Sequence, residues 1–116
     1  MASMPSVHVH FLNKDPSVRA LYDLLLKTLV KFGPIEEDPK KTSIHINRNS
    51  ALVGVETRKD CLLLTIKADH QINSPRIEKL EQISAQRFYH KVRIRSVEDF
   101  DAELNSWLKE AYQLAE

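Results

Sequence analysis

The chain has 116 residues, of which 42% are hydrophobic and 28% are charged, and its net charge is only +1. This composition is typical of one soluble globular domain. Two glycines are too few for a glycine-rich phosphate loop, and the apolar runs are far shorter than the roughly 20 residues that span a bilayer. The single cysteine, Cys61, has no intramolecular disulfide partner, which favours the reducing cytoplasm as the setting.

Charge is unevenly distributed along the chain. Residues 40–95 contain twelve lysines and arginines against five acids, whereas residues 96–116 contain one base against six acids. A basic middle segment can therefore create a strong local field although the whole chain is nearly neutral.

A first helix is predicted from about residue 16 to residue 32. Asp15 is a suitable N-cap and Pro16 fits the first helical position. Gly33 and Pro34 then end the helix. The acidic run at 36–39 is interpreted as a solvated loop. Within the helix predicted over residues 16–32, apolar residues recur on one face: Val18, Leu21, Tyr22, Leu25, Leu29 and Phe32.

Strands are predicted over residues 42–47, 51–57 and 61–67, where apolar and polar residues alternate. The connections at 48–50 and 58–60 are short, which favours antiparallel hairpins. Residues 69–75 form a longer polar loop. Residues 76–83 are ambiguous, because apolar residues at spacing three favour a helix whereas the position favours a strand. We interpret them as a fourth strand.

A fifth strand, predicted over residues 88–95, has two unlike faces because successive strand side chains alternate. Phe88, His90, Val92 and Ile94 would contribute to the core. The opposite face carries four cations, which we call the cation row, with Tyr89 among them: Arg87, Lys91, Arg93 and Arg95.

A second helix is predicted to begin at Ser96 as its N-cap, with acids in its first turn that complement the helix dipole. Its apolar stripe includes Trp107, which is expected to be buried against Leu21 or Leu25. The predicted fold class is α+β: a single antiparallel five-stranded sheet with both helices packed on one face. One domain would span residues 1–116, with residues 1–14 as a flexible or loosely packed segment.

On this architecture the cation row points away from the helices. The same outward face of the sheet would carry side chains from the other strands: Ser43, His45, Asn47, Leu63, Thr65 and Lys67.

Four short segments resemble one known family: VRALY at 18–22, PKKTS at 39–43, VRI at 92–94 and LNSWL at 104–108. Within residues 15–67 and 90–112 they are similar to a bacterial family called domain of unknown function 5655. The resemblance implies one small α+β domain in a cytoplasmic bacterial setting. The resemblance also implies a kind of domain that is sometimes appended to nuclease-associated or predicted-transport modules. The family brings no assigned catalytic residues, so none are transferred to this chain.

Residues capable of metal binding or catalysis are scattered. His8 and His10 could share a strand face, but they lack a third ligand at motif spacing. Cys61 has no recognisable paired base, and the acids at 98–103 serve the helix dipole. We therefore expect no metal, no cofactor and no catalytic residue, and an enzyme is the least favoured class.

The favoured function is an accessory module that binds anions or nucleic acid through the basic sheet face, with cations contacting phosphates and Tyr89 stacking on a base. The alternative is a protein-interaction or regulatory module, such as a homodimer, with Leu52 and Leu63 buried in a partner. A further alternative is that the cation row only protects an edge strand from aggregation. The candidate anion-binding residues are Lys40, Lys41, Lys67, Arg87, Tyr89, Lys91, Arg93 and Arg95.

Overall fold

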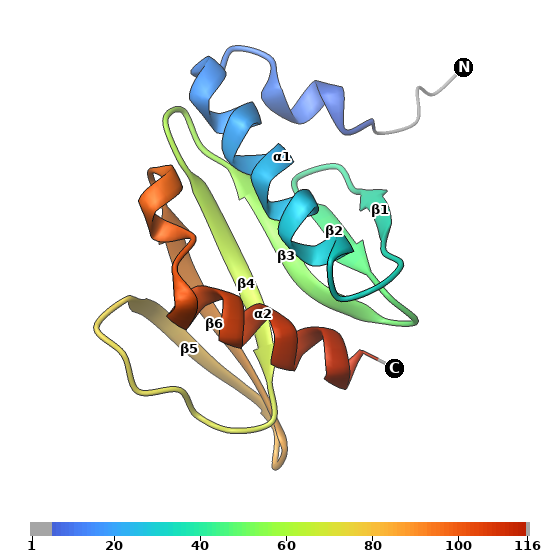
Figure 1. Ribbon diagram of the computed structural model, residues 1–116, viewed down its shortest axis with the longest axis vertical. Coiled ribbons are helices and arrows are strands. Elements are labelled where there is room, and N and C mark those ends of the chain that lie inside the picture. Colours follow the sequence, from blue (N-terminus) through green and yellow to red (C-terminus); the bar gives the residue numbers. More distant parts are fainter. Residues whose placement is uncertain (1–5, 116) are drawn as a thin grey trace.

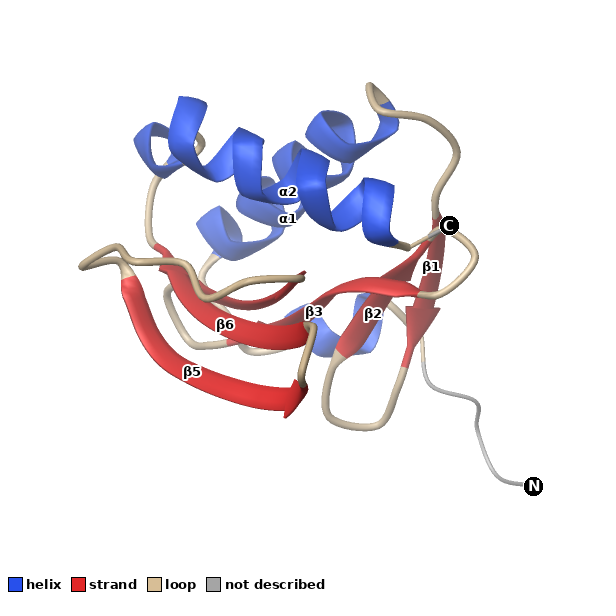
Figure 2. Ribbon diagram, turned by 90° about the horizontal axis from the view of Figure 1, so that it is seen from below, coloured by secondary structure: helices blue, strands red, loops and turns tan. Residues whose placement is uncertain are grey.

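The computed structural model describes residues 6–115 and places two helices, α1 (Pro16–Val30) and α2 (Ala102–Leu114), on one face of a single antiparallel sheet (Figures 1 and 2). The α+β class and the position of the helices are as predicted, but the sheet has six strands, not five, in the order β1-β2-β3-β4-β6-β5. The strands are β1 (Glu36–Pro39), β2 (Ile44–Asn47), β3 (Ala51–Thr57), β4 (Leu62–Ala68), β5 (Ile77–Ser84) and β6 (Arg87–Ile94).

Helix α1 begins as predicted, because the Asp15 carboxylate accepts a hydrogen bond from the Ser17 amide at 2.9 Å. Its apolar face packs on the sheet and on α2 in one buried cluster. The start of α2 differs from the prediction. Asp101, not Ser96, caps this helix, through a 3.0 Å bond from the Leu104 amide. Ser96 precedes a separate 3-10 turn, Val97–Asp99, whose Asp99 carboxylate accepts from the amides of residues 95 and 96.

The interpretation of residues 36–39 as a solvated loop is wrong, because they form strand β1 at one edge of the sheet. This strand pairs antiparallel with β2 from Glu36↔Asn47 to Pro39↔Ile44. Its stability comes from backbone pairing and from polar side-chain contacts. One of these joins β1 to α1, since the Tyr22 hydroxyl donates to the Glu37 carboxylate at 2.7 Å. Burial and this hydrogen bond raise the pKa of Tyr22 well above its usual range.

The ambiguous segment at 76–83 is a strand, as we predicted. β5 lies at the other edge of the sheet, and β6 is inserted between β4 and β5. The start of β5 is attached to α2 through Arg76, whose guanidinium donates to Asp101 at 2.9 Å and to Glu103 at 3.3 Å. The same guanidinium lies 5.6 Å from the centre of the Trp107 ring. Trp107 is buried in the same cluster as Leu21 and Leu25.

The N-terminal segment includes a 3-10 turn at His8–Phe11. Phe11 packs against the core, with its ring centre 5.1 Å from that of Tyr22. The Thr57 hydroxyl donates to the His10 carbonyl at 2.6 Å, which connects the segment to β3. Residues 1–5 of the segment that we expected to be loosely packed lie outside the described residues. Neither α1 nor α2 is long and apolar enough to cross a membrane, and they are the longest helices within residues 6–115.

The last turn of α2 is attached to the turn between β2 and β3. The Ala115 carbonyl accepts from the amides of Asn49 at 3.0 Å and Ser50 at 3.3 Å. The Arg48 guanidinium donates to the Tyr112 carbonyl at 3.1 Å and lies 4.5 Å from the centre of the Tyr112 ring. The C-terminal end of α2 and the β2–β3 turn are therefore held together by backbone and side-chain contacts.

His90 is fully buried, and its Nε2 accepts a 3.0 Å hydrogen bond from the Ile72 amide in the loop before β5. Only the neutral ring can accept this bond with Nε2, and burial is the main cause that lowers the pKa of His90. The unfolded chain thus binds more protons than the folded one below the unfolded pKa of about 6.5. The contribution of neutral, buried His90 to the free energy of unfolding should be complete above that pH. It should decrease as the pH drops toward the lower pKa of the folded state.

We expect the unfolding free energy, measured by denaturant titration, to be lower at pH 5.5 than at pH 7.5. The His90→Gln variant should lose most of this difference, because its side chain does not titrate. An unchanged pH dependence in the variant would show that another group is responsible.

Candidate functional site

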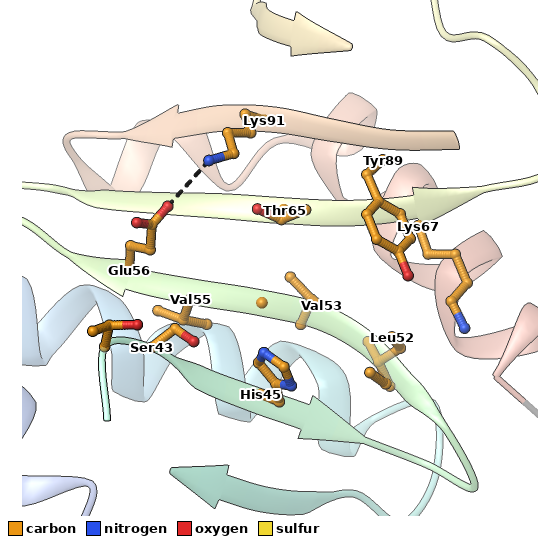
Figure 3. A pocket seen from close by; sticks show the side chains of 13 residues that line it. Ser43, His45, Leu52, Val53, Val55, Glu56, Thr65, Lys67, Tyr89 and Lys91 are labelled. Carbon is orange, nitrogen blue, oxygen red and sulfur yellow. Dashed lines mark hydrogen bonds and ion pairs between the residues drawn. The ribbon is translucent and has the colours of Figure 1, made fainter. Parts of the chain in front are cut away.

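The face of the sheet opposite the helices contains a hollow of about 280 Å³ (Figure 3). It extends across β2, β3, β4 and β6. Tyr89 and Lys67 lie at one end, and Glu56 with Lys91 at the other. The residues that line it include Ser43, His45, Gly54, Glu56, Thr65, Lys67, Tyr89 and Lys91.

The strand register builds the floor of this hollow. His45 of β2 pairs with Gly54 of β3, Gly54 pairs with Thr65 of β4, and Thr65 pairs with Lys91 of β6. One continuous row of neighbours therefore crosses four strands on the same face. The next row brings Lys67 of β4 opposite Tyr89 of β6. Small side chains in the middle of the first row leave the floor open.

Two cations of the cation row are paired with carboxylates of neighbouring strands. Arg93 makes a bidentate contact with Glu78 of β5, with N–O distances of 2.9 and 3.1 Å. Lys91 reaches over β4 to Glu56 of β3 at 3.4 Å. The Arg93 guanidinium lowers the pKa of Glu78. Exposed pairs of this kind contribute little stability, but they reduce the charge that these two cations offer to a ligand.

The positive charge is less compensated near Tyr89. The Lys67 ammonium lies 3.4 Å from the Ser50 hydroxyl, and within residues 6–115 no carboxylate is within 4 Å of it or of the Arg87 guanidinium. Burial, and then the charge of Arg87, lower the pKa of Lys67. Burial and the charge of Arg87 therefore disfavour the charged form of Lys67 at this end of the hollow, which is the electrostatic condition that an anion would relieve.

The structure brings together only part of the candidate set. Lys67, Tyr89 and Lys91 line the hollow. Lys40 pairs instead with Asp38 at 2.9 Å, and Lys41 is exposed. Arg95 is exposed and borders a separate depression beside Arg93. Arg87 and Arg93, like these three candidates, are not among the described residues that line the hollow.

The suggestion that the cation row protects an edge strand is wrong, because β6 is an interior strand that pairs with β4 on one side and β5 on the other. The expectation that Leu52 and Leu63 are available to a partner is also wrong, since they are 1% and 5% exposed. Leu52 is an extra residue in β3, because Ile46 pairs with Val53 whereas Asn47 pairs with Ala51. This bulge places Leu52 in the main core cluster.

Some lining residues were not among the candidates. Ser43 and His45 had been placed on the outward face, but they had no assigned role. Gly54 could have been noticed as a glycine inside a strand pattern, which is a recognised signal of close approach to the backbone. Within residues 6–115, no group of three or more histidine, cysteine and acidic side chains is arranged to hold a metal ion.

Sequence comparison places the chain in a family. A family model described as Domain of unknown function (DUF5655) matches residues 7–115. The chain belongs to this family. The DUF5655 match covers both helices and all six strands, including the four strands that form the hollow. Searches of curated proteins and of solved structures find no match. A function for this DUF5655 domain must therefore be argued from the chemistry of the hollow.

Proposed function

We propose that the domain is a binding module for an anionic ligand, in particular nucleic acid, and that the hollow on the open sheet face is its contact site. The observation that carries the proposal is Lys67, which lacks a carboxylate within 4 Å among the described residues, lies near the charge of Arg87 and pairs with Tyr89 in the register of β4 and β6. Cations next to an aromatic ring on a sheet are the elements of a single-strand platform.

In this proposal each residue has a distinct role. Lys67 and Arg87 contact phosphate, while Tyr89 stacks on one base. The Glu56–Lys91 pair and the hydroxyl of Ser43 offer donors and acceptors at the opposite end. Among the described residues, Tyr89 is the one phenylalanine, tyrosine or tryptophan that lines the hollow, so stacking on a large ring is limited to about one position. Phosphate contacts then dominate the affinity, which should decrease steeply with salt.

The test is the Lys67→Ala, Arg87→Ala double variant, titrated with a labelled oligothymidylate at several salt concentrations. We expect weaker binding at low ionic strength. The slope of log affinity against log salt should become shallower by about 0.7 for each phosphate of the single strand that the variant no longer neutralises.

The matched control is the Lys40→Ala, Lys41→Ala double variant, which removes the same formal charge outside the hollow. It should retain most of the affinity. An equal loss in both double variants would mean that overall charge, not this site, attracts the strand. Failure of the wild-type domain to bind any oligonucleotide at low ionic strength would refute the proposal.

A second candidate function is self-association along the edge strand β5. This strand is exposed along nearly its whole length, and it presents Leu80 and Ile83 at 36% and 50% exposure. An exposed edge with apolar side chains can pair with a second copy. A dimeric elution volume that persists at high salt and is lost in an Ile83→Lys variant would favour this function.

A further inference from the structure

Gly54 lies in the floor of the hollow, and the fold gives no reason for a glycine there. Within residues 6–115, Gly33 is the glycine with a positive φ, so the backbone of Gly54 is accessible to any L-residue. A Cβ atom built on Gly54 would lie 3.6 Å from the Thr65 Cβ and 3.9 Å from the His45 Cδ2. Both distances are ordinary van der Waals contacts, so packing does not require a glycine either.

A glycine inside a strand is unfavourable, because it loses more chain entropy on folding than alanine and has no side chain to pack. Strand glycines that the backbone does not need commonly mark a place where another group approaches the main chain closely. At Gly54 that group would come from the open side, since Thr65 and His45 flank the glycine within the sheet. A ligand group that occupies the hollow and contacts the main chain would therefore explain why residue 54 is a glycine.

We propose that the planar base of one nucleotide unit, the same base that contacts Tyr89, lies flat on the backbone at Gly54, with its phosphate at Lys67 and near the charge of Arg87. This inference rests on the proposed function and deepens it by naming the unit that is bound. The middle of the floor, at Gly54 and Thr65, offers no charged side chain, which suits the face of an aromatic heterocycle. The polar groups of Ser43, Glu56 and Lys91 stand at the borders, where the edge of a base presents donors and acceptors.

The dimensions of the site agree with one nucleotide. Thr65 in the floor and Lys67 at the end of the hollow are two residues apart on β4, which is about 6.7 Å at the rise of a strand. This separation is comparable to the reach of a sugar between its base and its phosphate. A volume of about 280 Å³ accommodates one such unit and not several stacked bases.

The experiment compares Gly54→Val with wild type on two strands of equal length and charge, an oligothymidylate and its abasic counterpart. The wild type should prefer the strand with bases by about tenfold, the effect of one stacked base. The valine side chain fills the floor, so Gly54→Val should lose this preference and bind both strands as the wild type binds the abasic one. Gln82→Val, a neutral change on β5 outside the hollow, should keep the preference.

A second variant separates binding from folding. Gly54→Ala should have a thermal midpoint equal to or above that of the wild type, because neither the backbone nor packing needs the glycine.

Competition with thymidine monophosphate tests whether the bound unit is a free nucleotide or part of a strand. Displacement of the strand by the free nucleotide assigns the site to mononucleotides, whereas no displacement by it, with the base preference intact, assigns the site to a nucleotide within a strand.

The inference is overturned if Gly54→Val keeps the wild-type preference for bases, or if the wild type binds both strands equally. In either case salt-dependent strand binding would still support the proposed function. A lower thermal midpoint for Gly54→Ala would also overturn it, since the glycine would then be required for folding. Absence of wild-type binding to either strand would instead remove the proposed function together with this inference.

Discussion

Replacing Trp107 with alanine is expected to lower the free energy of unfolding by about 3–5 kcal/mol. The indole is 8% exposed and belongs to the cluster that joins both helices to the sheet. Its removal would leave a cavity at the surface between α2 and the start of β5. It would also remove the ring that lies 5.6 Å from the Arg76 guanidinium, so the attachment of β5 to α2 should weaken as well.

The measurement is urea denaturation of the wild type and the variant, followed by circular dichroism because the variant lacks the tryptophan. Trp107→Phe should cost less, since phenylalanine fills most of the space. Lys109→Ala, an exposed change on the same helix, should change stability by less than about 0.5 kcal/mol. A loss below about 1 kcal/mol for Trp107→Ala would contradict the burial described for this ring.

Replacing Gly33 with alanine should destabilise the fold by about 2–5 kcal/mol, the sum of a strained backbone and a steric clash. Gly33 has φ = +150°, a conformation that side chains rarely adopt. A Cβ atom at this position would lie only 2.1 Å from the Tyr112 hydroxyl oxygen and 2.9 Å from Cζ. The tyrosine would have to move, and its 3.1 Å hydrogen bond to the Pro34 carbonyl would break.

Gly54→Ala is the matched control, because it adds the same methyl group to a backbone without positive φ and without a clash. Denaturant titration should show this variant to be as stable as the wild type or more stable. In a Tyr112→Phe background, Gly33→Ala should cost less, since the clashing oxygen is gone. Equal losses at the two glycines would refute the role assigned to the conformation of Gly33.

Hydrophobic periodicity was sufficient to predict both helices and the strands β2, β3, β4 and β6, because their buried faces repeat along the chain. Strand β5 was predicted from its position, against an apolar spacing of three that favours a helix. It failed for β1, whose sequence EEDP contains no apolar periodicity. That strand exists because β2 presents free backbone groups and because Glu37 accepts from Tyr22, a residue in another element. Such a cause involves distant parts of the chain and leaves no local pattern in the sequence.

The candidate site was predicted only in part, because strand alternation can be recognised locally, whereas strand order and register depend on distant parts of the chain. Strand alternation placed Lys67, Tyr89 and Lys91 on the outward face, and the structure brings these three together. Alternation could not show that β6 inserts between β4 and β5, which brings Glu78 to Arg93 and makes the cation row internal to the sheet. The hollow depends on cross-strand register, which sets Gly54 between His45 and Thr65.

The contacts between the end of α2 and the turn before β3 have a consequence for how the chain folds. Arg48 and its partner Tyr112 are 64 residues apart, and the amides of Asn49 and Ser50 depend on the carbonyl of Ala115. At a synthesis rate of about 5–20 residues per second, the ribosome makes the turn several seconds before its partners. During that interval β2 and β3 can pair, but the turn between them lacks its contacts with α2. Ser50, and the Lys67 ammonium that contacts the Ser50 hydroxyl, are then not yet held in place. The sheet face that carries the hollow should therefore be among the last parts of the domain to become ordered as the nascent chain emerges.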